Sequence, residues 1–479
     1  MTGPPPTAQP LDQNDVDKIV QAVAQSAVQP MVIAVADRAG NILAIFETQP
    51  VAPPTGIGNF SHAENAGELA VALARTAASF SNNQAPLSTR TVRFISGIHF
   101  PPGVAGAPSG DLYGIENTNR GCPLNISYLP GKALSPARSI DGSSTGLGVL
   151  TGKADELDSD PNAVNPGGVP LFKNGFAVGG VGVVSTSNTI AEYAAFAGST
   201  NAGFLPSAAQ LPPPGVVIIG GIALPFVNQT TPPAAVRGGS NPGIYVQGPI
   251  DGSLPPEGML AGPIAGSGGL TQDDVQTIIN QAVATAEKTR AVIRLPQSSR
   301  TRMTIAVADL DGTILGLYRM PDGTVFSADV AVAKARNVIW FSSGGHVDLP
   351  GIPAGTALSN RTIGFGSQPL FPSGINGSGP GPFFSLYQFD TANPCTQGSD
   401  SANPQNQSGI VFFPGSLPLY KNGVLVGGLG VSGDGVDQDD YVTYNGAAGF
   451  LPPQSIDADN VVINNVRMPF LKFPRNPTQ

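Results

Sequence analysis

The chain has 479 residues, with 61 glycines and 47 prolines, and only 12% of its residues are charged against 41% that are hydrophobic. A disordered chain shows the opposite balance, so this composition indicates a folded protein rich in loops. The formal net charge of −9, without any cluster of Lys and Arg, argues against nucleic acid as a partner. No apolar stretch approaches the roughly 18 residues of a membrane span.

Two features of the sequence bear on the cellular location of the protein, and they favour different locations. The first ten residues, MTGPPPTAQP, lack the charged start and the apolar core of a signal peptide. The many Asn, Ser, Thr, Gly and Pro residues, with few Lys and Glu, are typical of exported bacterial proteins. We therefore expect a periplasmic or extracellular protein, and a cytoplasmic location stays open.

The first predicted element is an amphipathic helix. It follows Asp12, a good N-cap residue, and Asp15 lies three positions further on, where a carboxylate favours a helix N-terminus. Two apolar runs then follow, 32–37 and 42–46, and the short turn between them contains Gly40. This pattern predicts a β-hairpin.

Three more elements complete the first half of the chain. Residues 71–80, VALARTAASF, predict an Ala-rich helix, and residues 170–183, PLFKNGFAVGGVGV, predict a second hairpin. Its Asn-Gly pair suits a tight turn, because both residues tolerate positive φ. A closing helix begins at Glu192-Tyr193. The Gly179-Gly180 pair lacks the spacing of a phosphate-binding loop, so we interpret these glycines as points of close backbone approach.

All of these elements recur in the same order in the second half. The matching segments are 270–275, 304–309, 314–318, 332–341, 418–431, 440–441 and 448–452, and residues 358–363 match residues 87–92 of the first half. Such a series indicates two copies of one α+β unit, 11–228 and 270–479, joined by a Pro/Gly/Ser-rich linker at 229–269. Each copy carries an insertion before its second hairpin, at about 97–168 and 366–415.

The repeated blocks resemble the GlcG/HbpS family, which includes haem-binding and haem-degrading proteins and the C-terminal domain of PduO-type cobalamin adenosyltransferases. The resemblance is carried by the IAVAD hairpin, by Tyr318-Arg319-Met320, by Lys334-Ala335-Arg336 and by PLYKNGVLVGGLGV at 418–431. It implies an antiparallel sheet flanked by helices in each copy, in the order helix, hairpin, helix, insertion, hairpin, helix. It also implies self-association, a pseudo-twofold arrangement of the two copies, and haem or another tetrapyrrole as the ligand.

The three histidines are the candidate haem ligands, since haem iron commonly takes an imidazole. They are His62, His99 and His346, and none stands at an equivalent position in the two copies. Each is therefore weighed against the simpler interpretation of a hydrogen-bonded or exposed loop histidine.

Three basic residues of the Ala-rich helices are further candidates for cofactor binding. Arg75 and Arg336 occupy matching positions, whereas Lys334 is matched by Leu73. The arginines could hold a haem propionate, but a helix arginine more often caps carbonyl groups or pairs with a neighbouring carboxylate. Trp340 is the only tryptophan and is expected in the core or on a contact surface.

The two cysteines, Cys122 and Cys395, lie in corresponding insertions. They are too few for a disulfide framework or a four-ligand zinc site. In a pseudo-twofold arrangement equivalent points can meet at the axis, so a Cys122–Cys395 disulfide is one hypothesis, and two unlinked cysteines are the other.

The sequence contains no HExxH, CxxC or GxSxG motif. Haem degradation or another small-molecule oxidation would therefore rest on family analogy alone. Our preferred interpretation is a binding protein for haem or a similar small cofactor. The alternative is an assembly subunit that uses the tandem fold and its neutral insertions for oligomerisation.

Overall fold

The computed structural model divides the chain into two compact units. The first contains the residues up to Phe94 and those from 165 to Pro255, and the second contains Ile95–Ala133 and Pro256–Gln479. The insertion of the first copy therefore contributes residues to the second unit. The structure describes residues 7–48, 55–56, 64–107, 110–134, 165–206, 216–233, 239, 242–343, 347–372, 375–399 and 406–479.

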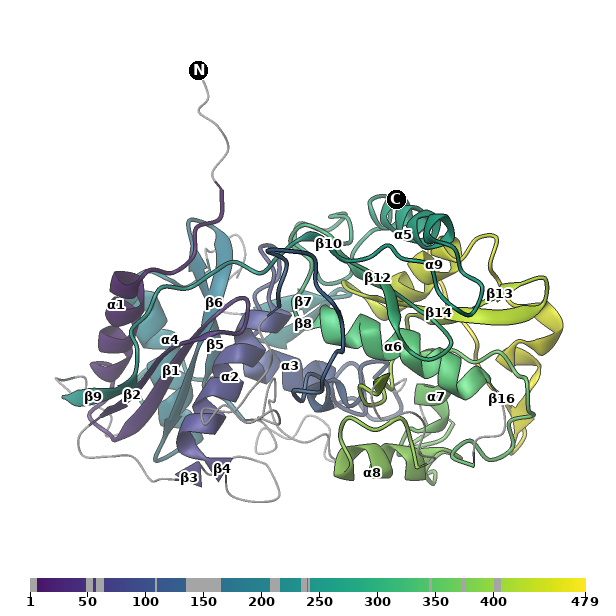
Figure 1. Cartoon of the computed structure of the whole chain (residues 1–479). Helices are drawn as coiled ribbons and strands as arrows, with labels where there is room; N and C mark the ends of the chain where they lie inside the picture. The colour runs from purple at the N-terminus through teal and green to yellow at the C-terminus, as the bar shows by residue number, and fades with distance from the viewer. Residues whose placement is uncertain are drawn as a thin grey trace. The chain divides into compact units, whose positions relative to one another are not determined.

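The first unit is built on a five-stranded antiparallel sheet with the order β5-β6-β1-β2-β9 (Figure 1). Its strands are β1 (Met31–Asp37), β2 (Ile42–Thr48), β5 (Gly168–Lys173), β6 (Phe176–Ser185) and β9 (Gly243–Gln247). The short pairs are β3 (Thr55–Gly56) with β4 (Glu64–Asn65), and β7 (Val216–Ile219) with β8 (Ile222–Pro225). The helices of this copy are α1 (Gln13–Ala24), α2 (Ala66–Phe80), α3 (Thr89–Ile95) and α4 (Asn188–Ala202).

The second unit repeats this sheet, with the order β10-β12-β11-β14-β13. Its strands are β10 (Gly258–Ala261), β11 (Thr304–Ala308), β12 (Ile314–Arg319), β13 (Ser416–Lys421) and β14 (Val424–Ser432), with a terminal pair β15 (Val462–Ile463) and β16 (Val466–Arg467). The helices are η1 (Ile115–Asn117), α5 (Gln272–Ala286), α6 (Ser327–Ser342), α7 (Asn360–Gly366), α8 (Phe384–Ala392), α9 (Val436–Gly446), η4 (Gln454–Ile456) and η5 (Ala458–Asn460). The predicted class, two α+β repeats with helix-flanked antiparallel sheets, is confirmed. The pseudo-twofold arrangement stays a prediction.

Both edge strands β9 and β10 come from the stretch expected to be a linker. β9 pairs with β2 in the first sheet, and β10 pairs with β12 in the second. Part of the Pro/Gly/Ser-rich stretch therefore completes the two sheets.

The local signals of the sequence act as expected. Asp12 and Thr271 each form a capping box with the Asp three residues later. In the second hairpin of each copy, the Asn residues Asn174 and Asn422 have φ values of 54° and 52°, and a Gly with positive φ follows each. Asp37 accepts a hydrogen bond from the backbone N–H of the turn residue Asn41 (2.9 Å).

The paired glycines explain how one helix approaches each sheet so closely. A Cβ at Gly180 would collide with the carbonyl oxygen of Ala74 in α2, and a Cβ at Gly428 would collide with that of Ala335 in α6. The helix pairs α1–α4 and α5–α9 pack on the other faces; there Val275 and Ile279 of α5 lie beside Gly316. The cores of both units form between these layers.

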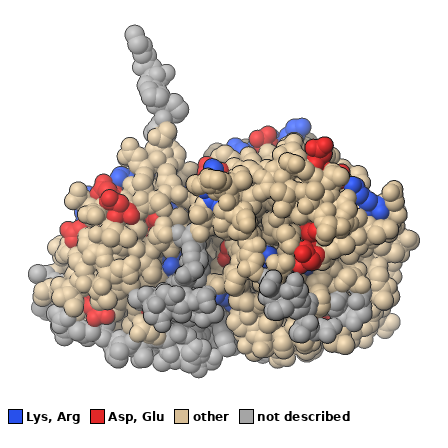
Figure 2. Space-filling view, viewed as in Figure 1, with Lys and Arg blue, Asp and Glu red and all other residues tan. Residues whose placement is uncertain are grey.

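No helix in the described part of the chain combines the length and the apolar character needed to cross a bilayer. Figure 2 shows that charged groups on the face in view are scattered among neutral residues. This sparse pattern agrees with the low charge content of the sequence.

Candidate functional site

One stripe of α6 lines two neighbouring hollows of the second unit. Its members are separated by four or three residues, a spacing that places side chains on one face of a helix. Asp329 and Ala333 line the first hollow, and Arg336, Trp340 and the C-cap residue Ser343 line the second.

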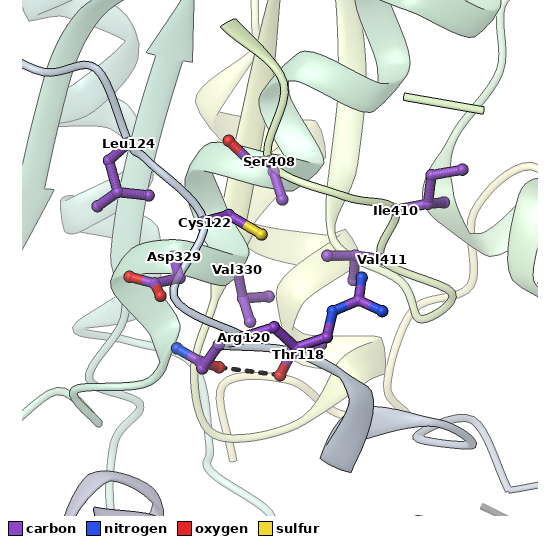
Figure 3. Close-up of a pocket in the computed structure, with 11 residues that line it drawn as sticks. Thr118, Arg120, Cys122, Leu124, Asp329, Val330, Ser408, Ile410 and Val411 are labelled. Atoms are coloured by element: carbon purple, nitrogen blue, oxygen red, sulfur yellow. Dashed lines mark hydrogen bonds between the residues drawn. The ribbon is translucent and has the colours of Figure 1, made fainter. Parts of the chain in front are cut away.

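The first hollow is a small pocket of about 20 Å³ between α6 and a covering segment, residues 117–124 (Figure 3). Thr118 Oγ1 donates to Asn119 Oδ1 (2.9 Å), and Asn119 Nδ2 donates to the carbonyl of Phe326 (3.0 Å). Burial raises the pKa of Asp329 to about 6. The other lining residues are Arg120, Cys122, Leu124, Val330, Ala333, Ser408, Ile410 and Val411.

The covering segment is held by a disulfide and an ion pair. Cys122 is joined to Cys395, with their Cα atoms 5.2 Å apart. The Arg120 guanidinium lies 2.9 Å from the Asp390 carboxylate. Burial raises the pKa of Asp390, and the charge of Arg120 opposes that rise. A segment of the first copy's insertion is thus fixed within the second unit.

The second hollow is an open cleft of about 220 Å³. Trp340 provides its aromatic wall, and Ile339 and Leu310 add apolar surface. The remaining lining residues are polar or small, namely Asp311, Gly312, Arg336, Ser343, Gln397, Asn406 and Gln407. This mixture of apolar and polar side chains fits the usual description of a small-molecule site.

Arg336 separates the two hollows and binds groups of the protein itself. Its Nε donates to the carbonyl of Gly312 (2.9 Å), its Nη2 donates to that of Leu124 (2.7 Å), and its Nη1 donates to Ser408 Oγ. The side chain is buried, and burial lowers its pKa to about 10. The carbonyl-capping role weighed from the sequence is therefore observed.

Lys334 points elsewhere and is fully buried. Its Nζ lies 3.0 Å from Asp439 Oδ2, donates to the carbonyl of Val431 (2.8 Å) and lies 5.0 Å from the centre of the Phe413 ring. Burial lowers the pKa of Lys334 and raises that of Asp439 to about 7. This lysine lines neither hollow.

Arg75 in α2 repeats the contact of its counterpart. Its Nε donates to the carbonyl of Gly40 (2.9 Å), as Arg336 does to Gly312. Burial lowers its pKa to about 10 as well. The carbonyl contact is thus common to both copies, and Trp340 is not, because Ser79 takes its place in α2.

The histidines are not brought together among the residues that the structure describes. His62 and His346 lie outside the described residues. His99 is half-buried in the second unit and lines neither hollow, and no described residue forms a hydrogen bond with its Nδ1.

Sequence reasoning did not single out the amide side chains Gln397, Asn406 and Gln407 of the cleft lining, which are called the polar wall below. Gln397 is only 3% exposed, yet its Oε1 has no hydrogen-bond partner in the described part of the chain. Asn406 Nδ2 donates to the carbonyl of Asp311 (2.9 Å). These amides come from an insertion without periodicity, and only the nearness of Gln397 to Cys395 could have drawn attention to it.

Comparisons with known proteins place a family match on the second repeat. A family model described as haem degrading protein HbpS-like matches residues 270–448. The corrinoid adenosyltransferase PduO of Salmonella typhimurium is 25% identical over 151 residues, which cover 32% of this chain and 33% of the relative. An uncharacterized 15.0 kDa protein of Citrobacter freundii is 26% identical over 165 residues, which cover 34% of this chain and 87% of that protein. The chain spans about a third of the length of the adenosyltransferases that it matches.

Several solved structures also resemble the chain. A PduOC–heme complex is 22% identical and covers 38% of this chain and 94% of its own, with a TM-score of 0.25. Protein ORFY of Klebsiella pneumoniae is 21% identical and covers 37% and 88%, with a TM-score of 0.25. A double mutant of HbpS from Streptomyces reticuli is 22% identical and covers 39% and 96%, with a TM-score of 0.23.

Proposed function

We propose that the second repeat of this chain binds haem or a similar small ring-shaped cofactor, because residues 270–448 match the family model described as haem degrading protein HbpS-like. The observation that carries this proposal is the open cleft beside the C-terminal half of α6. It is the larger of the two hollows described above.

The cleft supplies the contacts that a planar ring needs. Trp340 offers an aromatic surface for stacking, and Ile339 and Leu310 offer apolar contact with the ring. Arg336 places positive charge at the boundary of the cleft, although its hydrogen bonds to the protein fix its orientation. The cleft lining thus combines apolar side chains with polar ones, and such a combination can orient a ligand that has both apolar and polar surface.

An axial ligand for haem iron would come from outside the described lining. The described lining residues of the cleft include no His and no Met. His346 follows Trp340 by six residues in the sequence and is therefore the first histidine to test. His99 and His62 follow as the second and third.

The test is a haem titration of the purified protein followed by absorbance. We expect a saturable shift of the Soret band, and Trp340→Ser should weaken binding at least about tenfold, because one stacking surface is removed. Tyr444→Ser removes an exposed aromatic of α9 that does not line the cleft, so it serves as the control. His346→Ala, His99→Ala and His62→Ala then assign the axial ligand from the band position. Absence of any saturable shift at micromolar haem would contradict the proposal.

A further inference from the structure

The polar wall of the cleft contains one buried group whose bonding is incomplete. Gln397 is 3% exposed, it lines the cleft, and its side-chain Oε1 accepts no hydrogen bond from the described residues. A buried amide oxygen without a donor costs free energy, and native proteins keep few such groups. A ligand that brings a donor to this point would remove that cost.

The position of Gln397 is set by the chain around it. It follows Cys395 by two residues, and the Cys122–Cys395 disulfide joins this stretch to the covering segment. The next residue, Gly398, lies beside the Asp348 carboxylate, which accepts a hydrogen bond from the backbone N–H of Ser399 (3.0 Å). The Gln397 side chain therefore stands on a stretch that is fastened on both sides.

The charge pattern of the cleft also favours donors on the ligand. Asp311 contributes a carboxylate to the lining, which is an acceptor only when ionised. Three of the Arg336 donors are already directed at Gly312, Leu124 and Ser408. A ligand carboxylate only accepts hydrogen bonds and cannot satisfy Gln397 Oε1, whereas a ligand amide N–H or hydroxyl can donate to it.

We propose that Gln397 is a specificity-determining residue of this cleft, and that the ligand presents an amide N–H or a hydroxyl group to its Oε1. The inference rests on the proposed function and adds to it the chemistry of the ligand's edge. Rings with carboxamide or hydroxyl substituents are preferred over rings with carboxylates at the same place.

Two probes that differ only at this edge test the inference. One is haem, and the other is the haem diamide, in which both propionate carboxylates are converted to carboxamides. Both are titrated into the wild-type protein, into Gln397→Leu and Gln397→Met, and into Gln388→Leu, an exposed glutamine of α8 that lies outside the cleft lining. Thermal melts of each variant verify folding, and Gln397→Met keeps the side-chain length if the leucine variant does not fold.

We expect the wild-type protein and Gln388→Leu to bind the diamide about tenfold more tightly than haem, and the Gln397 variants to lose this preference. Equal affinity of the wild-type protein for the two rings would overturn the inference while leaving haem binding in place. An unchanged preference in Gln397→Met would overturn it as well. If neither ring binds to the wild-type protein, the proposed function fails together with this inference.

Discussion

The two repeats differ most clearly at one pair of buried positions beside the sheet. In the second repeat Lys334 forms an ion pair with Asp439, while the first repeat has Leu73 and Ala191 at the matching sequence positions. Leu73 and Ala191 are both buried. The same fold thus accepts either a buried ion pair or two apolar side chains, provided that both partners change together.

Other buried contacts are kept in both repeats. Arg90 pairs with Glu192 (2.6 Å), and Arg361 pairs with Asp440 (2.5 Å). The arginine of the Ala-rich helix binds a hairpin carbonyl in each copy. These shared contacts belong to the fold, so the second repeat is set apart by the Trp340 cleft and by the covering segment.

The largest expected effect comes from breaking the Lys334–Asp439 pair on one side only. Lys334→Leu copies the first repeat but leaves Asp439 buried without its cation, and we expect a loss of about 3–5 kcal/mol in unfolding free energy. The double variant Lys334→Leu/Asp439→Ala should recover most of that loss. Urea denaturation of the wild-type protein, Lys334→Leu, Asp439→Ala and the double variant measures these unfolding free energies. Equal destabilisation by Lys334→Leu and by the double variant would contradict the comparison.

Removing the disulfide should have the next largest effect. Cys122→Ser/Cys395→Ser is expected to lose about 2–4 kcal/mol of stability, because the cross-link closes a long loop in the unfolded chain. Haem affinity should fall as well, since Gln397 and Leu124 each lie two residues from a cysteine. Intact mass after alkylation without reductant provides the check, and two labelled thiols would contradict the cross-link.

The pH dependence of stability gives a smaller effect. The folded pKa of Asp329 is raised to about 6 from 3.8, so the folded state binds the proton more tightly than the unfolded state does. The resulting stability is present below pH 4 and is lost as the pH rises through 6. Because Asp329 is only half-buried, we expect Asp329→Asn to remove about 1 kcal/mol of that decline. The denaturation midpoints of the wild-type protein and of Asp329→Asn are measured at pH 4.5 and pH 7. An equal change of midpoint between the two pH values in both proteins would contradict the raised pKa of Asp329.

Most of the fold could be predicted from the sequence because its signals are local. Hydrophobic periodicity, the Asp12 and Thr271 caps and the two Asn-Gly turns specify helices and hairpins within short windows. The family resemblance then indicated how these elements combine.

The site could be predicted only in part because its walls come together over long distances. Arg336 binds the carbonyl of Leu124, 212 residues away in the sequence. Gln397 and Asn406 belong to an insertion without periodicity, so no pattern assigned them to the Trp340 wall. The buried roles of Lys334 and Arg336 depend on partners that only the folded chain identifies.

The stoichiometry of haem binding tests the central claim most directly, because it compares the two repeats within one molecule. Titration of the wild-type protein and of Trp340→Ser, with melts to verify folding, gives both the number of sites and the repeat that holds them. The account predicts one haem per chain in the wild-type protein and a strongly weakened site in Trp340→Ser. Two equivalent haems per chain, or one haem bound equally well by Trp340→Ser, would contradict it.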